Sequence, residues 1–292
     1  MKTIHTAAEL KQCITDQKKA DRTIGFVPTM GYLHEGHLSL IRRAKAENDY
    51  VIVSIFVNPL QFGPNEDFDR YPRDIERDQM LAAESGTDLL FHPSVEMMYP
   101  KQPTVTLKVS ERADVLCGGS RKGHFDGVAT VVAKLFMLTQ PDRAYFGLKD
   151  AQQVSVIEAM VSDLNLPVNI VPCDTVREKD GLAKSSRNVF LTKEERTEAA
   201  GIYAALKEAG EMLLSGMNVN EAQKRFGRSL AQRVSGEVDY AEILSYPELL
   251  PPNDNSARLI AAAAVKYSKA RLIDNILIDR SSDGKEKRNN DV

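Results

Sequence analysis

The chain has 292 residues, of which 42% are apolar and 27% charged, and its formal net charge at pH 7 is −3. This balance is typical of a globular protein of one or two domains and excludes a disordered chain. The absence of a basic excess argues against a dedicated nucleic-acid-binding protein, which needs positive charge to neutralise phosphates.

The sequence also points to a cytoplasmic protein without a membrane partner. No run of about 18 apolar residues is present, so we expect no transmembrane helix. The polar N-terminal stretch lacks the apolar core of a signal peptide. Three cysteines, Cys13, Cys117 and Cys173, match no metal-ligand spacing and are interpreted as reduced thiols.

The first half of the chain alternates predicted strands with predicted helices. Residues 23–28 (TIGFVP) form a short apolar run ended by a proline, which predicts a strand. Residues 37–47 place apolar side chains at helical spacing. Residues 50–57 (YVIVSIFV) are typical of a strand buried on both faces. Further elements are expected, in chain order, as a helix at 74–84, a strand at 88–92, a helix at 128–138, a strand at 143–146, a helix at 151–163 and a strand at 167–172.

This alternation indicates an α/β fold with a parallel sheet and helices on both faces. Ligands bind such sheets in the crevice at the carboxyl ends of the strands. We therefore expect the loops just after Val27, Val57 and Phe146 to form one site.

The pattern changes near residue 175. Residues 174–188 are polar and loop-like, and they are followed by predicted helices at 193–215 and 219–235 and by strands near 238–244, 258–266 and 270–279. We expect a first domain of residues 1–175 and a smaller α+β domain of residues 176–280. Residues 281–292 carry no apolar side chain before their end and are expected to be a disordered tail.

The clearest local motif is HxGH, which follows the first predicted strand and opens a helix. A helix N-terminus offers unpaired N–H groups and a partial positive charge, which suit a phosphate. His34 and His37 lie three residues apart, so one helical turn can aim both rings the same way, and Gly36 lets a nucleotide approach the backbone. The alternative is a pair of surface histidines near a helix cap, but the strand–loop–helix context favours function.

Two further clusters offer polar groups at the crevice. Asn58 and Gln61 follow the second predicted strand, and their amides can grip hydroxyl and carboxyl groups; a polar turn is the alternative. Arg121 lies in a glycine-broken loop and is a candidate partner for a phosphate or carboxylate, although a solvated loop explains it nearly as well.

Later motifs supply cations. Lys149 is a candidate phosphate ligand, Asp150 a candidate ribose or helix-cap acceptor, and Gln153 lies one turn further along the same predicted helix. The run Lys184-Ser185-Ser186-Arg187 places two cations around two hydroxyls, which suits a phosphate clamp on a loop that closes over ATP. An exposed basic turn is the alternative.

An acidic run of residues 67–78 is interpreted mainly as a solvated face. Asp78 within it is a candidate Mg²⁺ contact, because Mg²⁺ keeps most of its waters and needs few protein carboxylates.

Together these clusters resemble the pantothenate synthetase (pantoate–β-alanine ligase) family. Six motifs occur in the family's order and at its spacing, and the resemblance covers about residues 1–280. They are PTMGYLHEGH at 28–37, FVNPLQF at 56–62, YPRD at 71–74, GHFDGV at 123–128, FGLKDAQQ at 146–153 and DGLAKSSRN at 180–188.

The resemblance implies a Rossmann-like nucleotidyltransferase domain with the HxGH signature, a smaller C-terminal domain as a lid, a homodimer, and a requirement for Mg²⁺ and ATP. The reaction would convert pantoate, β-alanine and ATP into pantothenate, AMP and pyrophosphate through a pantoyl adenylate. His37 would be the general acid and His34 its partner on the phosphates, with Lys149 and Lys184 adding charge stabilisation.

The resemblance also implies the binding residues. Gln61 and Gln153 would hold pantoate, with Asn58 and Arg121 as further candidates. The ATP site would comprise Met30, Gly31, Tyr32, Leu33, His34, Glu35, Gly36, His37, Gly147, Leu148, Lys149, Asp150, Val176 through its backbone, Lys184, Ser185, Ser186 and Arg187. The family often has proline at the position of Lys122 and glutamate at that of Leu148, which puts in question only the local loop shape and a water-mediated metal contact.

Three other classes remain open at this point. An adenylyltransferase that moves AMP onto a phosphate shares this kind of loop but lacks an amine step. A small aminoacyl-tRNA synthetase-like protein would use KSSR as its signature loop, although the acidic balance opposes it. A nucleotide-binding module without catalysis would not need both histidines and both lysines.

Overall fold

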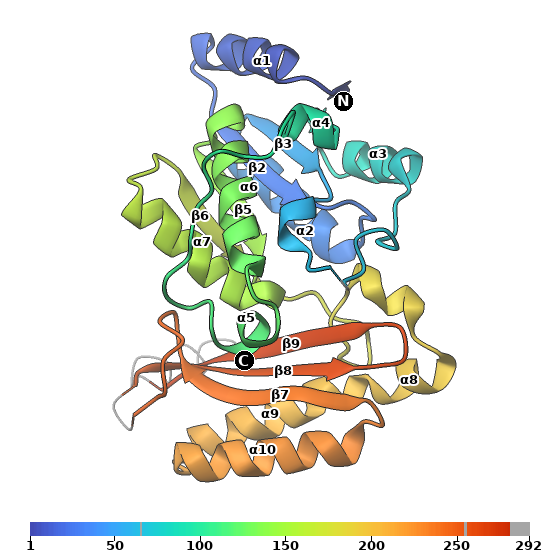
Figure 1. Ribbon diagram of the computed structural model, residues 1–292, viewed down its shortest axis with the longest axis vertical. Helices are drawn as coiled ribbons and strands as arrows, with labels where there is room; N and C mark the ends of the chain where they lie inside the picture. Colours follow the sequence, from blue (N-terminus) through green and yellow to red (C-terminus); the bar gives the residue numbers. More distant parts are fainter. Residues whose placement is uncertain (65, 254–255, 281–292) are drawn as a thin grey trace. The chain divides into compact units, whose positions relative to one another are not determined.

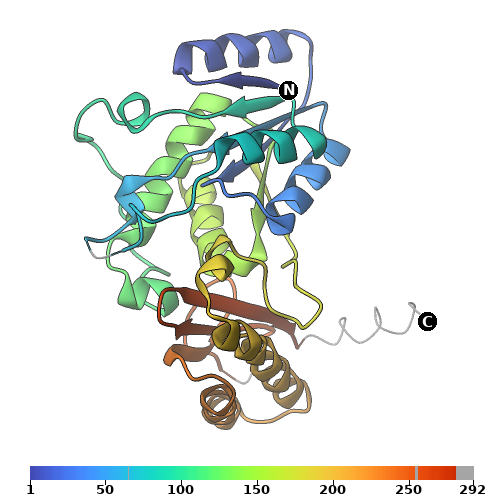
Figure 2. The same cartoon turned by 90° about the vertical axis from the view of Figure 1, so that its right-hand side faces the viewer.

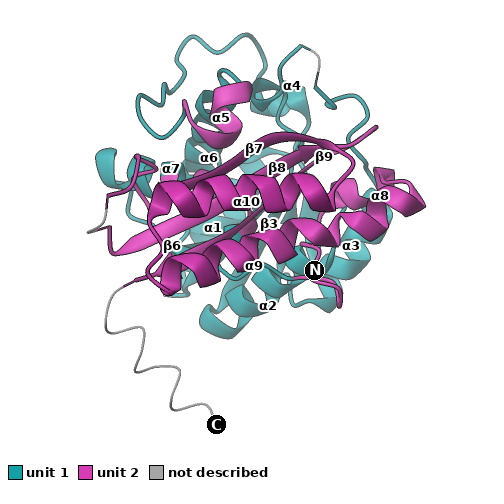
Figure 3. Ribbon diagram, turned by 90° about the horizontal axis from the view of Figure 1, so that it is seen from below, with its two compact units in different colours: residues 1–113, 121–148, 156–176 teal, residues 114–120, 149–155, 177–292 magenta. Residues whose placement is uncertain are grey.

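The computed structural model describes residues 1–64, 66–253 and 256–280, and it divides into two compact units (Figure 3). Unit 1 comprises residues 1–113, 121–148 and 156–176. Unit 2 comprises residues 114–120, 149–155 and 177 onward. No helix in the described part of the chain is both long enough and apolar enough to cross a membrane.

Unit 1 is built on a six-stranded parallel sheet with the order β1-β4-β3-β2-β5-β6. Both faces of the central strands are buried. Val27, Val51 and Val53 pack in the cluster that includes α2, whereas Phe26 on the other face meets Phe136 of α6 edge-on, with ring centroids 6.3 Å apart. The strands are β1 Lys2–Ile4, β2 Ile24–Thr29, β3 Tyr50–Ile55, β4 Leu89–Phe91, β5 Arg143–Gly147 and β6 Asn169–Cys173.

Helices cover both faces of this sheet (Figure 1). Helix α2 packs against β2, β3 and α3, and helix α6 packs against β2 and α1. Figure 2 shows β1 and α1 together at one end of the sheet. The helices of unit 1 are α1 Ala7–Lys19, α2 Glu35–Glu47, α3 Ile75–Glu84, α4 Val95–Met98 and α6 His124–Thr139, with the 3₁₀ turn η1 Pro59–Gln61; α7 Ala151–Asp163 contributes to both units.

Unit 2 is an antiparallel sheet of β7 Glu237–Ser245, β8 Arg258–Lys266 and β9 Arg271–Asp279, with β8 in the middle. Helices α9 Ala200–Leu214 and α10 Val219–Arg233 lie against this sheet (Figure 1). Phe226 and Leu230 of α10 join a buried cluster with Leu206 of α9. Shorter elements are α5 Leu116–Ser120, η2 Leu148–Asp150, η3 Ser186–Phe190 and α8 Lys193–Glu198.

The predicted fold class is confirmed: a Rossmann-like parallel sheet is joined to an α+β segment with its own antiparallel sheet. The predicted boundaries, residues 1–175 and 176–280, stay a prediction about independent domains. The predicted tail, residues 281–292, lies outside the described residues. The helix predicted at 193–215 is divided, because α8 ends at Glu198 and α9 begins at Ala200.

Sequence reasoning missed β1 and α1 at the N-terminus. A signal was present, because Thr6 and Glu9 form a capping box and Leu10 and Ile14 are buried one turn apart. The high content of charged residues hid this short apolar stripe.

Candidate active site

The strand order of unit 1 brings three predicted loops to one edge. β3, β2 and β5 are neighbours in the sheet, so the loops after Ile55, Thr29 and Gly147 leave the same carboxyl edge. The chain order reverses between β2 and β5, which is the switch point where α/β sheets bind ligands. The three loops therefore share an edge, and the expectation that they form one site stays a prediction.

The two histidines of the HxGH motif cap helix α2. The Nδ1 atom of His34 accepts the N–H of Gly36 at 3.1 Å, and Nδ1 of His37 accepts the N–H of His34 at 3.3 Å. The ring centroids are 4.1 Å apart. Because each Nδ1 is an acceptor, the proton of the neutral ring is assigned to Nε2. An Nε2–H group is a donor of the kind that suits phosphate oxygens.

We call residues 30–37 the histidine loop. Asp78 of α3 anchors this loop through hydrogen bonds to its backbone. The two Asp78 oxygens accept the backbone N–H groups of Tyr32 at 2.6 Å and Leu33 at 2.7 Å. A Cβ at Gly31, whose φ is +84°, would lie 2.9 Å from a side-chain carbon of Ile55. Burial raises the pKa of the Asp78 carboxyl, and hydrogen bonds from Leu33 and Tyr32 oppose that rise. Sequence reasoning did not foresee this anchoring role.

The Mg²⁺ contact of Asp78 stays a prediction. It would require an oxygen that already accepts a backbone N–H to bind the ion as well. Among the described residues, no group of three or more His, Cys, Asp or Glu side chains is placed to hold a metal ion.

Asn58 positions Gln61. The Asn58 side chain is 1% exposed, and its Nδ2 group donates to Oε1 of Gln61 at 3.2 Å and to the carbonyl of Gly127 at 3.1 Å. Its Oδ1 atom accepts the hydroxyl of Tyr99 at 3.0 Å. The Nε2 group of Gln61 lies 3.2 Å from Sδ of Met30, so Gln61 reaches the histidine loop. Substrate contact by Asn58 stays a prediction, since its amide is already occupied in supporting Gln61.

Glycine is required where η1 meets α6. A Cβ at Gly127 would lie 2.2 Å from the carbonyl oxygen of Leu60. No protein contact tolerates that separation, so any side chain would push η1, and Gln61 with it, off the helix.

Arg121 also supports Gln61 in this structure. Its guanidinium forms a two-pronged pair with Glu66, at 2.7 and 2.6 Å, and donates to the carbonyl of Gln61 at 3.3 Å. Nδ1 of His124 lies 2.8 Å from the same carbonyl. Burial is the largest single effect and would raise the pKa of Glu66, but the hydrogen bonds and charge of Arg121, the backbone N–H bonding at Gly63 and the charge of His124 together hold that pKa below its usual value. Sequence reasoning missed Glu66 and His124, although His124 lies inside a motif that it used.

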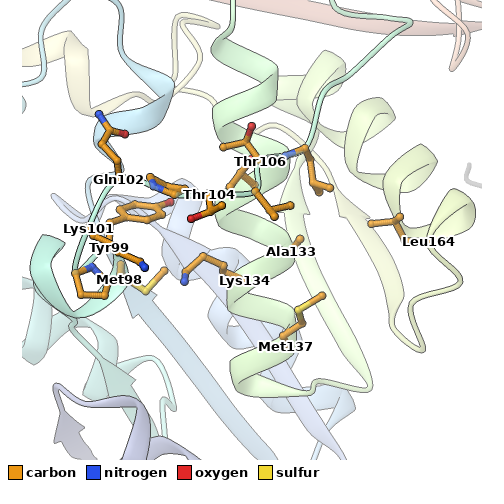
Figure 4. Close-up of a pocket in the computed structure, with 15 residues that line it drawn as sticks. Met98, Tyr99, Lys101, Gln102, Thr104, Thr106, Ala133, Lys134, Met137 and Leu164 are labelled. Atoms are coloured by element: carbon orange, nitrogen blue, oxygen red, sulfur yellow. Dashed lines mark hydrogen bonds between the residues drawn. The ribbon is translucent and has the colours of Figure 1, made fainter.

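A cavity of about 380 Å³ lies beside this support (Figure 4). It is lined by residues 98–107 together with side chains of α6 such as Ala133, Lys134 and Met137, and none of the predicted site residues lines it. Its wall includes Tyr99, the hydroxyl of which contacts Asn58. Burial raises the pKa of Tyr99 to about 12, so this hydroxyl stays protonated and donates.

Unit 2 carries the remaining cations, in two pieces that we call the lysine segments, residues 149–155 and 177–188. Lys149 lies 3.7 Å from Asp150, and Lys184 pairs with Glu178 at 2.9 Å. The hydroxyl of Ser185 caps η3 by accepting the N–H of Arg187 at 3.2 Å. Gln153 is half-buried in the first turn of α7.

The predicted site residues thus form two groups. Within unit 1 the structure brings together the histidine loop, Gln61 and its supports Asn58 and Arg121, and it places Gly147 at the same sheet edge, with Val176 following β6. A Cβ at Gly147 would meet nothing within 4 Å, so packing within the protein does not require glycine there. Unit 2 holds the lysine segments. Convergence of the two groups on one ATP stays a prediction.

Known proteins resemble this chain over nearly its whole length. The family model for pantoate-beta-alanine ligase matches residues 2–277. Pantothenate synthetase of Bacillus subtilis is 56% identical over 279 residues, which cover 96% of this chain and 98% of that protein. The relative of the same name from Bacillus licheniformis is 54% identical over 283 residues, 97% of this chain and 98% of that protein.

Solved structures agree with these sequence relatives. Pantothenate synthetase of Thermus thermophilus superposes with a TM-score of 0.90 at 49% identity, covering 94% of this chain and 99% of that one. A pantoate-beta-alanine ligase from Francisella tularensis, solved with β,γ-ATP and β-alanine, has a TM-score of 0.79 at 36% identity, covering 95% of this chain and 97% of that one.

Proposed function

Because this chain belongs to the pantoate-beta-alanine ligase family, we propose that it joins pantoate to β-alanine at the expense of ATP. In the first step the pantoate carboxylate attacks the α-phosphorus of ATP, forming pantoyl adenylate and releasing pyrophosphate. In the second step the amine of β-alanine attacks the acyl carbon, forming pantothenate and releasing AMP. The observation that carries this proposal is the imidazole cap at the switch point, in a chain with this family membership.

The histidine loop binds the phosphates of ATP. With both Nδ1 atoms engaged by backbone N–H groups, His34 and His37 direct Nε2–H donors to the phosphate oxygens and stabilise charge that builds in the transition state. The general-acid role would require the protonated ring of His37, in which Nδ1 also carries a proton and no longer accepts the N–H of His34. Met30 to Gly36 and the segment Gly147–Asp150 surround the nucleotide, with the backbone of Val176.

Pantoate is held by amides. Gln61 offers a neutral amide that hydrogen-bonds hydroxyl and carboxyl groups without adding competing charge. Its position is supported by Asn58 and by the Arg121–Glu66 pair. Gln153 supplies the second amide. This arrangement favours a role for Asn58 and Arg121 mainly in shaping the pantoate site.

The cations act on the triphosphate. Lys149, Lys184 and Arg187 neutralise developing charge, and Ser185 and Ser186 donate hydroxyl hydrogen bonds. Lys184 pairs with Glu178 at 2.9 Å, so ATP would compete with that carboxylate for the ammonium group. Mg²⁺, when bound with ATP, would shield the departing pyrophosphate. An Mg²⁺ ion that the phosphates hold needs few protein carboxylates, and Asp78 is the candidate contact.

The second step needs a protected adenylate, because an acyl phosphate anhydride hydrolyses in water. We propose that the C-terminal segment acts as the lid that excludes water. We also propose that two copies of the chain form a homodimer. The protein would work in the cytoplasm, without nucleic acid or membrane partners. Family membership supports these proposals; size-exclusion chromatography with light scattering tests the dimer.

The experiment that tests the function is an assay with ATP and pantoate, first without and then with β-alanine. Without the amine we expect pantoate-dependent exchange of labelled pyrophosphate into ATP; with it we expect pantothenate and AMP in equal amounts. A dinucleotide-like product and no amide would indicate an adenylyltransferase instead. Salt-sensitive binding of tRNA would favour the synthetase-like alternative.

A further inference from the structure

Unit 2 contains a buried ion pair that none of the proposed steps uses. The Arg177 guanidinium meets both oxygens of Asp274, at 2.6 and 3.0 Å, and Asp274 is 4% exposed. The same guanidinium stacks on Tyr203 of α9, 3.7 Å from the ring centroid. It also donates to the carbonyls of Gly181 at 3.1 Å and Asn275 at 3.2 Å.

One branch of this network leads to Lys184. Arg177 pairs with Ala183 in an isolated antiparallel bridge, so the chain between them is a closed turn that ends one residue before Lys184. Gly181 in this turn has φ +97°, and a Cβ there would lie 2.5 Å from Cδ1 of Tyr203. The ion pair and the ring therefore fix the base of the segment that presents Lys184.

The other branch leads to Lys149. Asn275 follows Asp274 in β9, and its backbone N–H donates to Asp274 at 2.8 Å, while its side chain donates to the Lys149 carbonyl at 2.8 Å. Adjacent residues of a strand point to opposite faces of the sheet. Asp274 and Asn275 thus join the Arg177 turn on one face of β9 to the Lys149 segment on the other. The partners of these two residues across β8 are Ala263 and Ala262, small side chains that leave room for them.

Stability alone does not account for such a pair, because the cost of removing two charges from water cancels much of their attraction. A buried pair with fixed geometry does, however, select one arrangement of the segments that it joins. We propose that Arg177, Asp274 and Asn275 are positioning residues that hold Lys149 and Lys184 in a fixed arrangement for the triphosphate of ATP. This inference rests on the proposed function for the role of the two lysines.

The test removes one branch at a time. Asn275→Ala deletes the hydrogen bond to the Lys149 carbonyl and leaves the Arg177–Asp274 ion pair intact. It therefore still tests the proposal if Asp274→Asn, which leaves Arg177 without its carboxylate, fails to fold. Asp279→Asn is the matched control for Asp274→Asn: it removes a carboxylate from the same strand, in an exposed pair with Arg258, and touches neither lysine segment. Each variant is made in the full chain.

The first readout is pantoate-dependent pyrophosphate exchange. We expect Asn275→Ala to lower kcat about tenfold, the rate equivalent of one lost hydrogen bond, with an unchanged KM for pantoate. In a Lys149→Ala background the same change should have less than about a twofold effect, because it acts only through Lys149. A full tenfold loss in that background would overturn the proposal.

The second readout needs no activity, so it separates this inference from the proposed function. In Asn275→Ala, amide hydrogen exchange of the protein without nucleotide should become faster at residues 149–151. In Asp274→Asn it should become faster both there and at residues 181–184, whereas Asp279→Asn should change exchange at neither segment. Unchanged exchange at these residues would overturn the positioning role. Absence of pyrophosphate exchange in the wild-type protein would instead refute the proposed function.

Discussion

The histidine loop of unit 1 and the lysine segments of unit 2 are held in place by different means. The loop is fixed by backbone N–H groups, which donate within the HxGH cap and to the single carboxylate of Asp78. The lysine segments depend on an ion pair between Arg177 and Asp274, side chains 97 residues apart. A short motif can thus encode its own geometry, whereas two cations that lie far apart in the sequence need a third, distant element to align them.

The largest effect should come from the loop itself. His37→Ala removes an Nε2–H donor aimed at the phosphates, and we expect kcat for pyrophosphate exchange to fall by about 10²–10³. His5→Ala, which removes an imidazole that contacts the carbonyl of His92 on the same unit, is the control. A rate within about twofold of wild type for His37→Ala would show that His37 does not stabilise the transition state.

Asp78→Asn tests whether one carboxylate anchors the loop. An amide has a single acceptor oxygen, so either Tyr32 or Leu33 loses its partner, at a cost of roughly 1–3 kcal/mol in the free energy of unfolding. We expect a lower Tm and a higher KM for ATP. Glu76→Gln, an exposed neutralisation on the same helix, should change neither. Equal behaviour of the two variants would mean that the loop is held by other contacts.

Gly181→Ala tests the turn that precedes Lys184. The substitution places a Cβ against Tyr203 at a positive φ, and strain of about 1–2 kcal/mol is expected from the backbone alone. Gly216→Ala carries the same backbone strain at φ +88° with nothing within 4 Å, so it isolates the Tyr203 contact. Thermal unfolding should shift in both variants, but pyrophosphate exchange should slow only in Gly181→Ala. Equal rates of pyrophosphate exchange in the two variants would show that strain in the turn does not alter the position of Lys184.

The smallest effect is expected at Glu66, which belongs to neither the histidine loop nor the lysine segments. Because Arg121 holds the pKa of Glu66 below its usual value, the pair contributes stability above about pH 4.3, the ordinary Glu value, and loses it as the pH falls through the lowered pKa. Glu66→Gln should therefore have a lower Tm than wild type at pH 6, and the difference should shrink at pH 3. A difference independent of pH would argue against a charged pair.

Sequence reasoning succeeded where the signal is local. Residues 151–163 and 258–266 match α7 and β8 to the residue, and the loops after β2, β3 and β5 share an edge as the alternating pattern predicted. It failed where a contact joins distant residues. Substrate contact by Asn58 stays a prediction, but the sequence did not foretell that its amide is buried against Gln61 and Gly127, and nothing in it marks Asp274 as the partner of Arg177.

His37 and Lys184 must act on the same triphosphate if the proposed mechanism holds. A double-mutant cycle with His37→Ala and Lys184→Ala, measured as kcat for pantoate-dependent pyrophosphate exchange, tests this most directly. We predict that the double variant loses less activity than the product of the two single losses, with a coupling of about 0.5–3 kcal/mol, as for groups that act in one network. Strict additivity would contradict this account, because it would show that the two side chains contribute independently and not through one network.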